Sequence, residues 1–188
     1  MRRGNLFVIS GPSGAGKGTL VARLMERVDD AWLSISVTTR SPRSHEEDGV
    51  HYYFVSRERF EELIAAGGLL EWAQYSGNYY GTPRASIEEK IREGKQVILE
   101  IEYQGAMQVK ERFPEAHLVF IKPPSMDELE RRLKGRGTES AEAIQLRMQT
   151  AKVELAHEME YDTSLVNDDI EDTTDELIAY INKFADAK

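Results

Sequence analysis

The 188-residue sequence contains no cysteine, which excludes disulfides and thiolate metal sites. Its four histidines are scattered without the spacing of metal ligands, so we expect no zinc site. No apolar run approaches the roughly 20 residues that span a bilayer, and the run in MRRGNLFVIS is too short for a signal peptide. We therefore expect a soluble, cytoplasmic protein without a membrane partner.

Basic residues are fewer than acidic ones. The chain has 24 Lys and Arg against 33 Asp and Glu, a formal net charge of −9. General binding to nucleic acid needs a basic surface, so we do not expect it here. Two local arginine clusters, TTRSPR and RRLKGRG, can still bind phosphate groups. Nothing in the sequence indicates whether the chain forms oligomers.

Strand-like apolar runs alternate with helical stretches along most of the chain. Buried strands are predicted at 6–10, 97–101 and 117–121. Helices are predicted from Lys17, over 104–112, after Ser125 and from near Thr173, the last two with a glutamate three residues on. This alternation predicts an α/β fold with a parallel sheet that helices cover on both faces.

Two segments interrupt the alternation. Residues 34–82 have the pattern of short strands around one helix at about 57–66, which predicts a small, mostly antiparallel insert. The glycine- and arginine-bearing stretch 133–143 separates two helices and indicates a hinge. We predict one domain made of a core (1–33, 83–132 and 160–188), an insert (34–82) and a lid (about 133–159).

The segment GPSGAGKGT at 11–19 lies between the first strand and the first helix. It matches G-x-x-x-x-G-K-[ST] at Gly11, Gly16 and Lys17, and therefore predicts a phosphate-binding loop. Such a loop turns successive backbone N–H groups toward an anion at a helix N-terminus. Gly18 occupies the position of the hydroxyl that normally binds Mg²⁺. Thr19 or water must take that role, so we assign no direct protein ligand to a metal.

The chemistry of a phosphate acceptor is indicated further along the chain. Arg40 and Arg43 lie three apart around Pro42, a spacing suited to gripping one phosphate from two sides. Hydroxyl and carboxylate side chains surround them in the sequence, at Ser36, Thr38, Thr39, Tyr52, Tyr53, Glu71, Tyr79, Tyr80 and Thr82.

These segments together resemble the guanylate kinases. The resemblance covers essentially the whole chain, in the family's order and spacing, through GPSGAGKGT, TTRSPR, DGVHYYFVS, EWAQYSGNYYGTP, LEIEYQGA, FIKPPS, LKGRGTES and VND. It implies a three-layer P-loop NTPase fold with a parallel sheet core, a GMP-binding insert and a helical lid. It also implies transfer of the γ-phosphate of ATP to GMP, with Mg²⁺ as cofactor, for guanine nucleotide synthesis and GMP recycling.

The resemblance further implies a role for each matching residue. ATP would bind the loop residues Gly11, Pro12, Ser13, Gly14, Ala15, Gly16, Lys17, Gly18 and Thr19, together with Arg136 and Asn167. GMP would bind Ser36, Arg40, Arg43, Tyr52, Glu71, Tyr80, Thr82 and Glu100. Catalytic charge would come from Lys17, Arg40, Arg43, Arg136 and Arg147. We expect Glu100 and Glu102 to project to the same face of a strand. The family often has aspartate at the position of Glu102, so we assign Glu102 no metal or water-positioning role.

Two other functions stay open at this stage. Guanylate-kinase-like domains of scaffold proteins keep the fold without catalysis, although the complete glycine loop and the lid arginines favour an enzyme. A kinase of another small phosphorylated acceptor would use the same loop with a different base or sugar pocket. A GTPase switch is disfavoured because the sequence lacks the N-K-x-D guanine motif.

Overall fold

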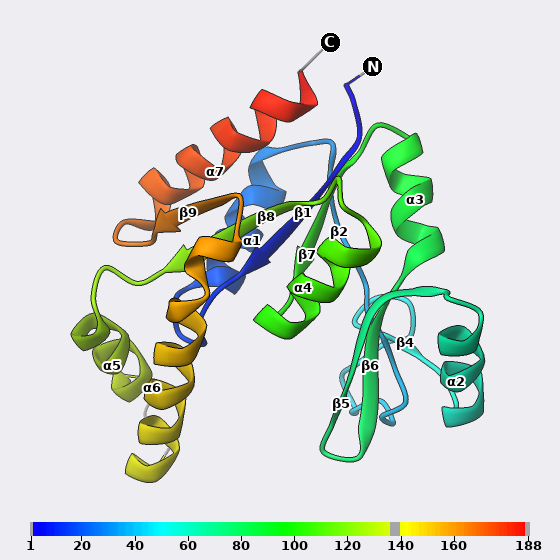
Figure 1. Ribbon diagram of the computed structural model, residues 1–188, viewed down its shortest axis with the longest axis horizontal. Coiled ribbons are helices and arrows are strands. Elements are labelled where there is room, and N and C mark those ends of the chain that lie inside the picture. Colours follow the sequence, from blue (N-terminus) through cyan, green and yellow to red (C-terminus); the bar gives the residue numbers. More distant parts are fainter. Residues whose placement is uncertain (1, 136–139, 187–188) are drawn as a thin grey trace.

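The computed structural model describes residues 2–135 and 140–186. Its centre is a parallel sheet of five strands in the order β2-β7-β1-β8-β9. These strands are β1 (Asn5–Ser10), β2 (Ala31–Leu33), β7 (Gln96–Glu100), β8 (His117–Lys122) and β9 (Thr163–Val166). Together with the flanking helices (Figure 1), this sheet confirms the predicted α/β class.

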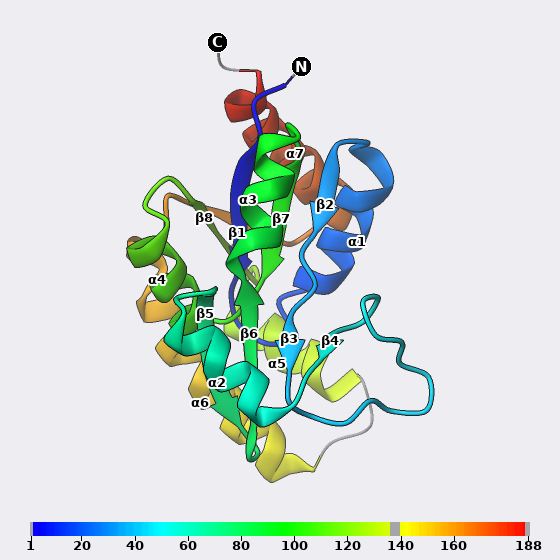
Figure 2. The same ribbon diagram turned by 90° about the vertical axis from the view of Figure 1, so that its right-hand side faces the viewer.

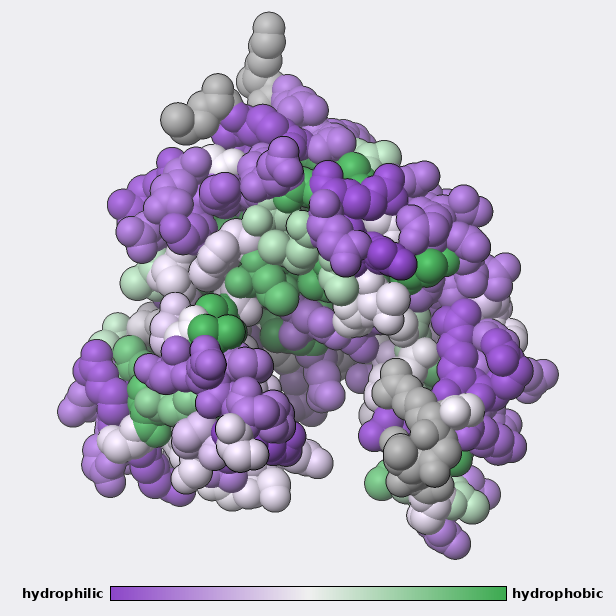
Figure 3. Space-filling model, turned by 180° about the vertical axis from the view of Figure 1, so that it is seen from behind, coloured by the Kyte–Doolittle hydropathy of each residue, from purple (hydrophilic) through white to green (hydrophobic). Residues whose placement is uncertain are grey.

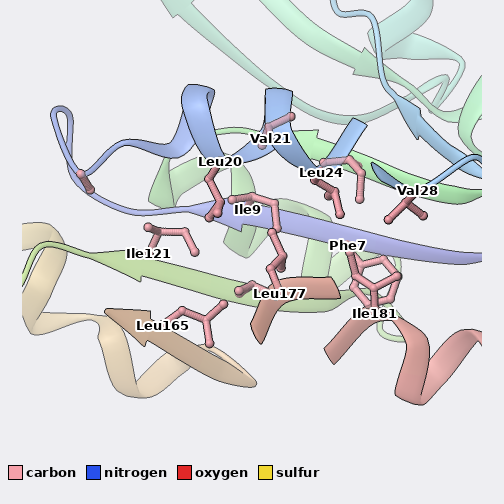
Figure 4. Close-up of a cluster of buried hydrophobic side chains, with 13 residues drawn as sticks. Phe7, Ile9, Leu20, Val21, Leu24, Val28, Ile121, Leu165, Leu177 and Ile181 are labelled. Atoms are coloured by element: carbon pink, nitrogen blue, oxygen red, sulfur yellow. The ribbon is translucent and has the colours of Figure 1, made fainter. Parts of the chain in front are cut away.

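Helices α1 (Lys17–Arg27) and α7 (Ile170–Ala185) cover one face of the sheet. All six residues of β1 are buried, as expected for a strand with helices on both sides. Phe7 and Ile9 of β1 pack in one cluster with side chains from both helices (Figure 4), including Leu24 of α1 and Leu177 of α7.

Helices α3 (Arg84–Arg92) and α4 (Tyr103–Arg112) cover the opposite face. Leu6 and Val8 of β1 alternate with Phe7 and Ile9, and therefore join the cluster on this second side. The cluster also includes Leu70, which belongs to a different sheet.

The insert has its own sheet in the order β4-β3-β6-β5. Its elements are β3 (Val37–Thr38), β4 (Tyr53–Phe54), α2 (Arg57–Ala65), β5 (Leu69–Tyr75) and β6 (Asn78–Pro83). Pairing is antiparallel except between β3 and β4, and Figure 2 shows this sheet below the core. A small separate cluster around Val37, Phe60 and Leu69 stabilises it.

Helices α5 (Met126–Gly135) and α6 (Ala141–Ala156) form a second lobe, followed by the short helix η1 (Glu158–Glu160). Leu129 and Leu133 of α5 pack against Ala151 of α6. Figure 3 shows the surface hollowed between this lobe and the insert. In the part of the chain that the structure describes, none of the helices is long and apolar enough to cross a membrane.

Helix starts were predicted with mixed success. The Ser125 hydroxyl accepts a hydrogen bond from the Glu128 N–H at 3.1 Å, which confirms that cap. The predicted start near Thr173 is wrong, because α7 begins at Ile170 with Asp169 as its cap. The Thr173 hydroxyl lies inside the first turn and instead donates to the Asp169 carbonyl at 2.6 Å.

The observed cap of α7 gives a test of this assignment. The Asp169 carboxylate accepts from the N–H groups of Glu171 at 2.8 Å and Asp172 at 3.1 Å. Asp169→Ala should lower the free energy of unfolding by about 1 kcal/mol, since two helix N–H groups lose their acceptor. In urea unfolding, the neighbouring change Asp168→Ala should stay within about 0.5 kcal/mol of the parent. Equal losses in both variants would contradict the assignment.

Candidate active site

The glycine loop connects β1 to α1 and packs tightly against the core. Gly11 has φ 139°, and a Cβ there would lie 2.0 Å from the Ile121 carbonyl oxygen of β8. Gly16 has φ 92°, and a Cβ there would lie 2.3 Å from the Asn167 amide nitrogen. Both positions therefore need glycine for backbone shape and for close packing.

Asn167 follows β9 and braces this loop. Its side-chain N–H donates to the Ala15 carbonyl at 2.7 Å, and the residue is only 4 % exposed. Its backbone N–H donates to the Lys122 carbonyl at 2.8 Å. The structure thus places Asn167 against the loop backbone, and its predicted contact with ATP stays a prediction.

A cavity of about 420 Å³ opens on the loop, lined by Ser13, Gly14, Gly16, Lys17, Gly18, Thr19 and Glu100. The parallel register pairs Ile9 with Glu100 and so brings the end of β7 beside the loop. Glu100, predicted to read guanine, therefore lies with the phosphate loop. Partial removal of its carboxylate from water raises its pKa, while the Lys17 charge opposes this rise.

Lys17 extends over the loop from the first turn of α1. Its ammonium donates to the carbonyls of Gly11 at 2.5 Å and Pro12 at 3.1 Å. Burial lowers the pKa of Lys17, and the nearby carboxylates of Glu100, Glu154 and Glu102 partly offset this effect. The prediction that Glu102 shares a strand face with Glu100 is wrong, because β7 ends at Glu100 and Glu102 is the cap residue of α4.

The second lobe reaches the loop through α6. Arg147 donates to the Ser13 hydroxyl at 3.2 Å, which brings this predicted lid arginine to the glycine loop. Glu154, two turns further along α6, lies close enough to Lys17 for their charges to interact. The other predicted lid arginine, Arg136, lies outside the described residues.

In the insert, Arg40 is held by an acid that the sequence interpretation missed. Its guanidinium makes two hydrogen bonds of 2.9 Å to the Glu46 carboxylate and lies 5.5 Å from the Tyr52 ring centroid. The rings of Tyr52 and Tyr80 are 6.2 Å apart in an edge-on arrangement. Arg40 and the Arg43 N–H lower the pKa of Glu46 to about 2.

The structure thus brings together Arg40, Tyr52 and Tyr80, whereas Arg43 is exposed. The Arg43 N–H donates to Glu46 at 2.7 Å, so the same carboxylate shapes the loop that carries both arginines. Ser36 lies where the chain enters this sheet, and its carbonyl accepts from the Tyr53 N–H at 2.9 Å. The available signal was the run of acids Glu46, Glu47 and Asp48 after the two arginines, which does not single out Glu46.

Glu71 and Thr82 form a buried polar pair across β5 and β6. The Thr82 hydroxyl donates to the Glu71 carboxylate at 2.6 Å, Glu71 is 7 % exposed, and Thr82 is fully buried. Burial raises the pKa of Glu71, opposed by the Thr82 hydrogen bond and the Arg112 charge. A buried carboxylate with spare acceptor positions suits a ligand that presents N–H donors.

Comparison with known proteins shows which family the chain resembles. Residues 3–184 match the family described as guanylate kinase. A guanylate kinase of Streptomyces coelicolor is 56% identical over 180 residues, covering 96% of this chain and 91% of the relative. One from Synechococcus is 55% identical over 175 residues, covering 93% and 92%.

A solved structure gives the same answer at the level of fold. The crystal structure of a guanylate kinase from Anaplasma phagocytophilum is 35% identical and has a TM-score of 0.76. The match covers all of this chain and 89% of that one. The agreement extends over the core, the insert and the second lobe, and the chain belongs to the guanylate kinase family of enzymes.

Proposed function

We propose that the chain transfers the γ-phosphate of ATP to GMP and releases ADP and GDP, serving guanine nucleotide synthesis and GMP recycling. The observation that carries this proposal is the buried Glu71–Thr82 pair, which occurs in the same chain as a glycine loop of the phosphate-binding type. The loop supports a nucleoside triphosphate as donor, and the pair supports a base with N–H donors as acceptor.

The loop cavity and Lys17 bind the β- and γ-phosphates of ATP in this proposal. Backbone N–H groups at the start of α1 and the Lys17 ammonium supply positive charge to that cavity. Arg147 is already hydrogen-bonded to Ser13 of the loop, so a small movement of α6 brings its guanidinium onto the γ-phosphate. Arg136 has the same proposed role on the basis of the family resemblance.

Mg²⁺ fits the residues at this cavity. Thr19 and Glu100 both line it and offer oxygen atoms, the ligand type that Mg²⁺ prefers. Among the residues at 2–135 and 140–186 there is no group of three acidic or histidine side chains arranged for a metal, so nucleotide phosphates and water would provide most of the ligands. The ion would neutralise charge on the phosphates during transfer.

Arg40, Tyr52 and Tyr80 bind the GMP phosphate from the insert, and Arg43 swings in from the exposed loop. Glu46 holds the Arg40 guanidinium in a fixed orientation through two hydrogen bonds. A fixed guanidinium loses less conformational freedom when it binds a phosphate. Glu46 therefore acts on GMP through Arg40.

The Glu71 carboxylate selects the base. In guanine, the N1–H and the exocyclic amine are adjacent donors that two acceptor positions of one carboxylate can satisfy. Adenine presents an acceptor at N1 and would leave the buried carboxylate poorly paired, which is the kind of mismatch that gives strong discrimination. Ser36 and Thr82 complete this part of the proposal. Glu100 lines the loop cavity, and its predicted contact with GMP stays a prediction.

The transfer itself needs alignment and charge neutralisation more than covalent help. The acceptor phosphate of GMP is already anionic, so no general base is required. Arginines from the two lobes and Lys17 balance the charge on the transferring group and hold donor and acceptor in line. Closure of the two lobes over the hollow in Figure 3 would keep water from hydrolysing ATP.

The direct test is a coupled assay of ADP formation with Mg·ATP and GMP, AMP, CMP, UMP or no acceptor. We expect turnover with GMP alone. Turnover with a different nucleotide would keep the loop assignment but overturn the role of Glu71. ATP binding without turnover on any acceptor would point to the catalytically silent interaction module or to a sugar-phosphate acceptor.

Two substitutions separate the donor and acceptor sides. Lys17→Ala should lower kcat by roughly 100-fold, because a charge that stabilises the transferring group is lost. Arg40→Ala should raise KM for GMP by about tenfold or more and leave KM for ATP unchanged, because it removes a charged contact to the acceptor phosphate only. Steady-state kinetics with each substrate varied in turn distinguishes them, and equal losses in all parameters for both variants would contradict the division of roles.

The raised pKa of Glu71 predicts a specific pH dependence. Recognition of guanine requires Glu71 in its ionised form, and burial raises the pKa of Glu71 above the ordinary value of 4.5. As pH falls from neutral, Glu71 takes up a proton earlier than an exposed glutamate would, so kcat/KM for GMP should decline. The phosphate of GMP itself titrates near pH 6. Dividing kcat/KM for GMP of the parent by that of Glu71→Gln at each pH cancels this contribution. A ratio that does not change with pH would contradict the prediction.

A further inference from the structure

Strand β5, which carries Glu71, is irregular immediately before that residue. Leu69 pairs with Pro83 and Glu71 pairs with Thr82, so the register shifts at Leu70 and forms a bulge. The two leucines pack in different places: Leu69 joins the cluster of the insert, and Leu70 joins the main core cluster. A bulge re-aims the side chains that follow it, and here the next side chain is Glu71.

Helix α4 of the core holds the outer edge of this strand. β5 is an edge strand of the insert sheet, and edge strands present backbone groups that need partners. The Gln108 amide makes both hydrogen bonds that a neighbouring strand would make: it accepts from the Trp72 N–H at 3.3 Å and donates to the Trp72 carbonyl at 3.1 Å. Trp72 is the residue directly after Glu71.

Two further residues on the same face of α4 act on the bulge and on Glu71. Arg112 donates to the carbonyls of Leu70 at 3.2 Å and Leu69 at 3.5 Å, the two residues at the register shift. Gly105 lies so close that a Cβ there would be 3.2 Å from the Glu71 carboxylate. The spacing Gly105, Gln108, Arg112 corresponds to positions i, i+3 and i+7 of a helix, which face one direction.

We propose that Gly105, Gln108 and Arg112 are positioning residues that fix Glu71 for selection of guanine. They act without contacting the base, by fixing the position and register of β5 and so the orientation of the Glu71 carboxylate. The inference rests on the proposed function, because it deepens the role of Glu71 in GMP recognition.

The reason such a clamp is needed lies in the geometry of recognition. Selecting guanine requires two adjacent hydrogen bonds to one carboxylate, and small displacements of a binding group weaken such paired contacts. The insert sheet packs on a small hydrophobic cluster of its own. Contact with the larger core therefore helps to fix the position of its edge strand β5. Charge adds to this arrangement, since the Arg112 guanidinium favours the ionised form of Glu71.

The test compares GMP with inosine monophosphate, which lacks the exocyclic amine. Gln108→Met keeps the side-chain length but removes both hydrogen bonds to Trp72. We expect kcat/KM for GMP to fall about tenfold, as for a weakened contact to a charged group. The value of kcat/KM for GMP divided by that for inosine monophosphate should decrease by a similar factor, while KM for ATP stays unchanged.

Gln74→Met is the matched control. It makes the same substitution on β5, at an exposed residue on the strand face opposite Glu71. Both the activity with GMP and the substrate ratio should stay within about twofold of the parent. Hydrogen exchange at the Trp72 amide gives a readout that does not depend on activity, and it should be faster in Gln108→Met alone.

A second variant keeps the proposal testable if Gln108→Met folds poorly. Gly105→Ala removes no hydrogen bond and favours the helix, but places a methyl group against Glu71, so the substrate ratio should narrow while the melting temperature is maintained. If the parent has no activity with GMP, the proposed function fails. If the parent is active and both Gln108→Met and Gly105→Ala keep its substrate ratio, the positioning role is overturned.

Discussion

The parallel pairing of β1 with β7 and β8 is the constraint on which the rest of the site depends. It brings the end of β7, with Glu100, beside the glycine loop, and it places Gly11 against the Ile121 carbonyl of β8. Because carboxyl ends of parallel strands share one edge, the loop, the start of α1 and Asn167 after β9 all meet there. The glycine loop is therefore supported by the fully buried strand β1 and its neighbour β8.

The acceptor side depends on a different kind of contact. The insert has only a small cluster of its own, and its strand β5 is joined to the core by Leu70 and by side chains of α4. Glu71 lies at this junction, buried and hydrogen-bonded to Thr82. Glu71, the proposed base-reading group, is thus attached to the core, whereas Arg40 and its partner Glu46 belong to the outer loop of the insert.

Sequence reasoning succeeded where the signal is local. The β1–loop–α1 unit, the three core strands and the Ser125 cap follow from contiguous residues. The predicted start of α7 was wrong, because Asp169 and not Thr173 caps the helix. The roles of Glu46, Gln108 and Arg112 were also missed. Gln108 pairs with a backbone 36 residues away, and no periodic pattern encodes such a contact between a side chain and a distant strand.

The most direct test of this account is a crystal structure with GMP and a non-hydrolysable ATP analogue bound together with Mg²⁺. We expect the guanine N1–H and exocyclic amine to bind the Glu71 carboxylate, the GMP phosphate to bind Arg40, Tyr52 and Tyr80, and the triphosphate to lie in the cavity beside Lys17. A guanine ring bound elsewhere in the hollow, with Glu71 making no contact to it, would contradict the assignment of Glu71 as the group that selects the base.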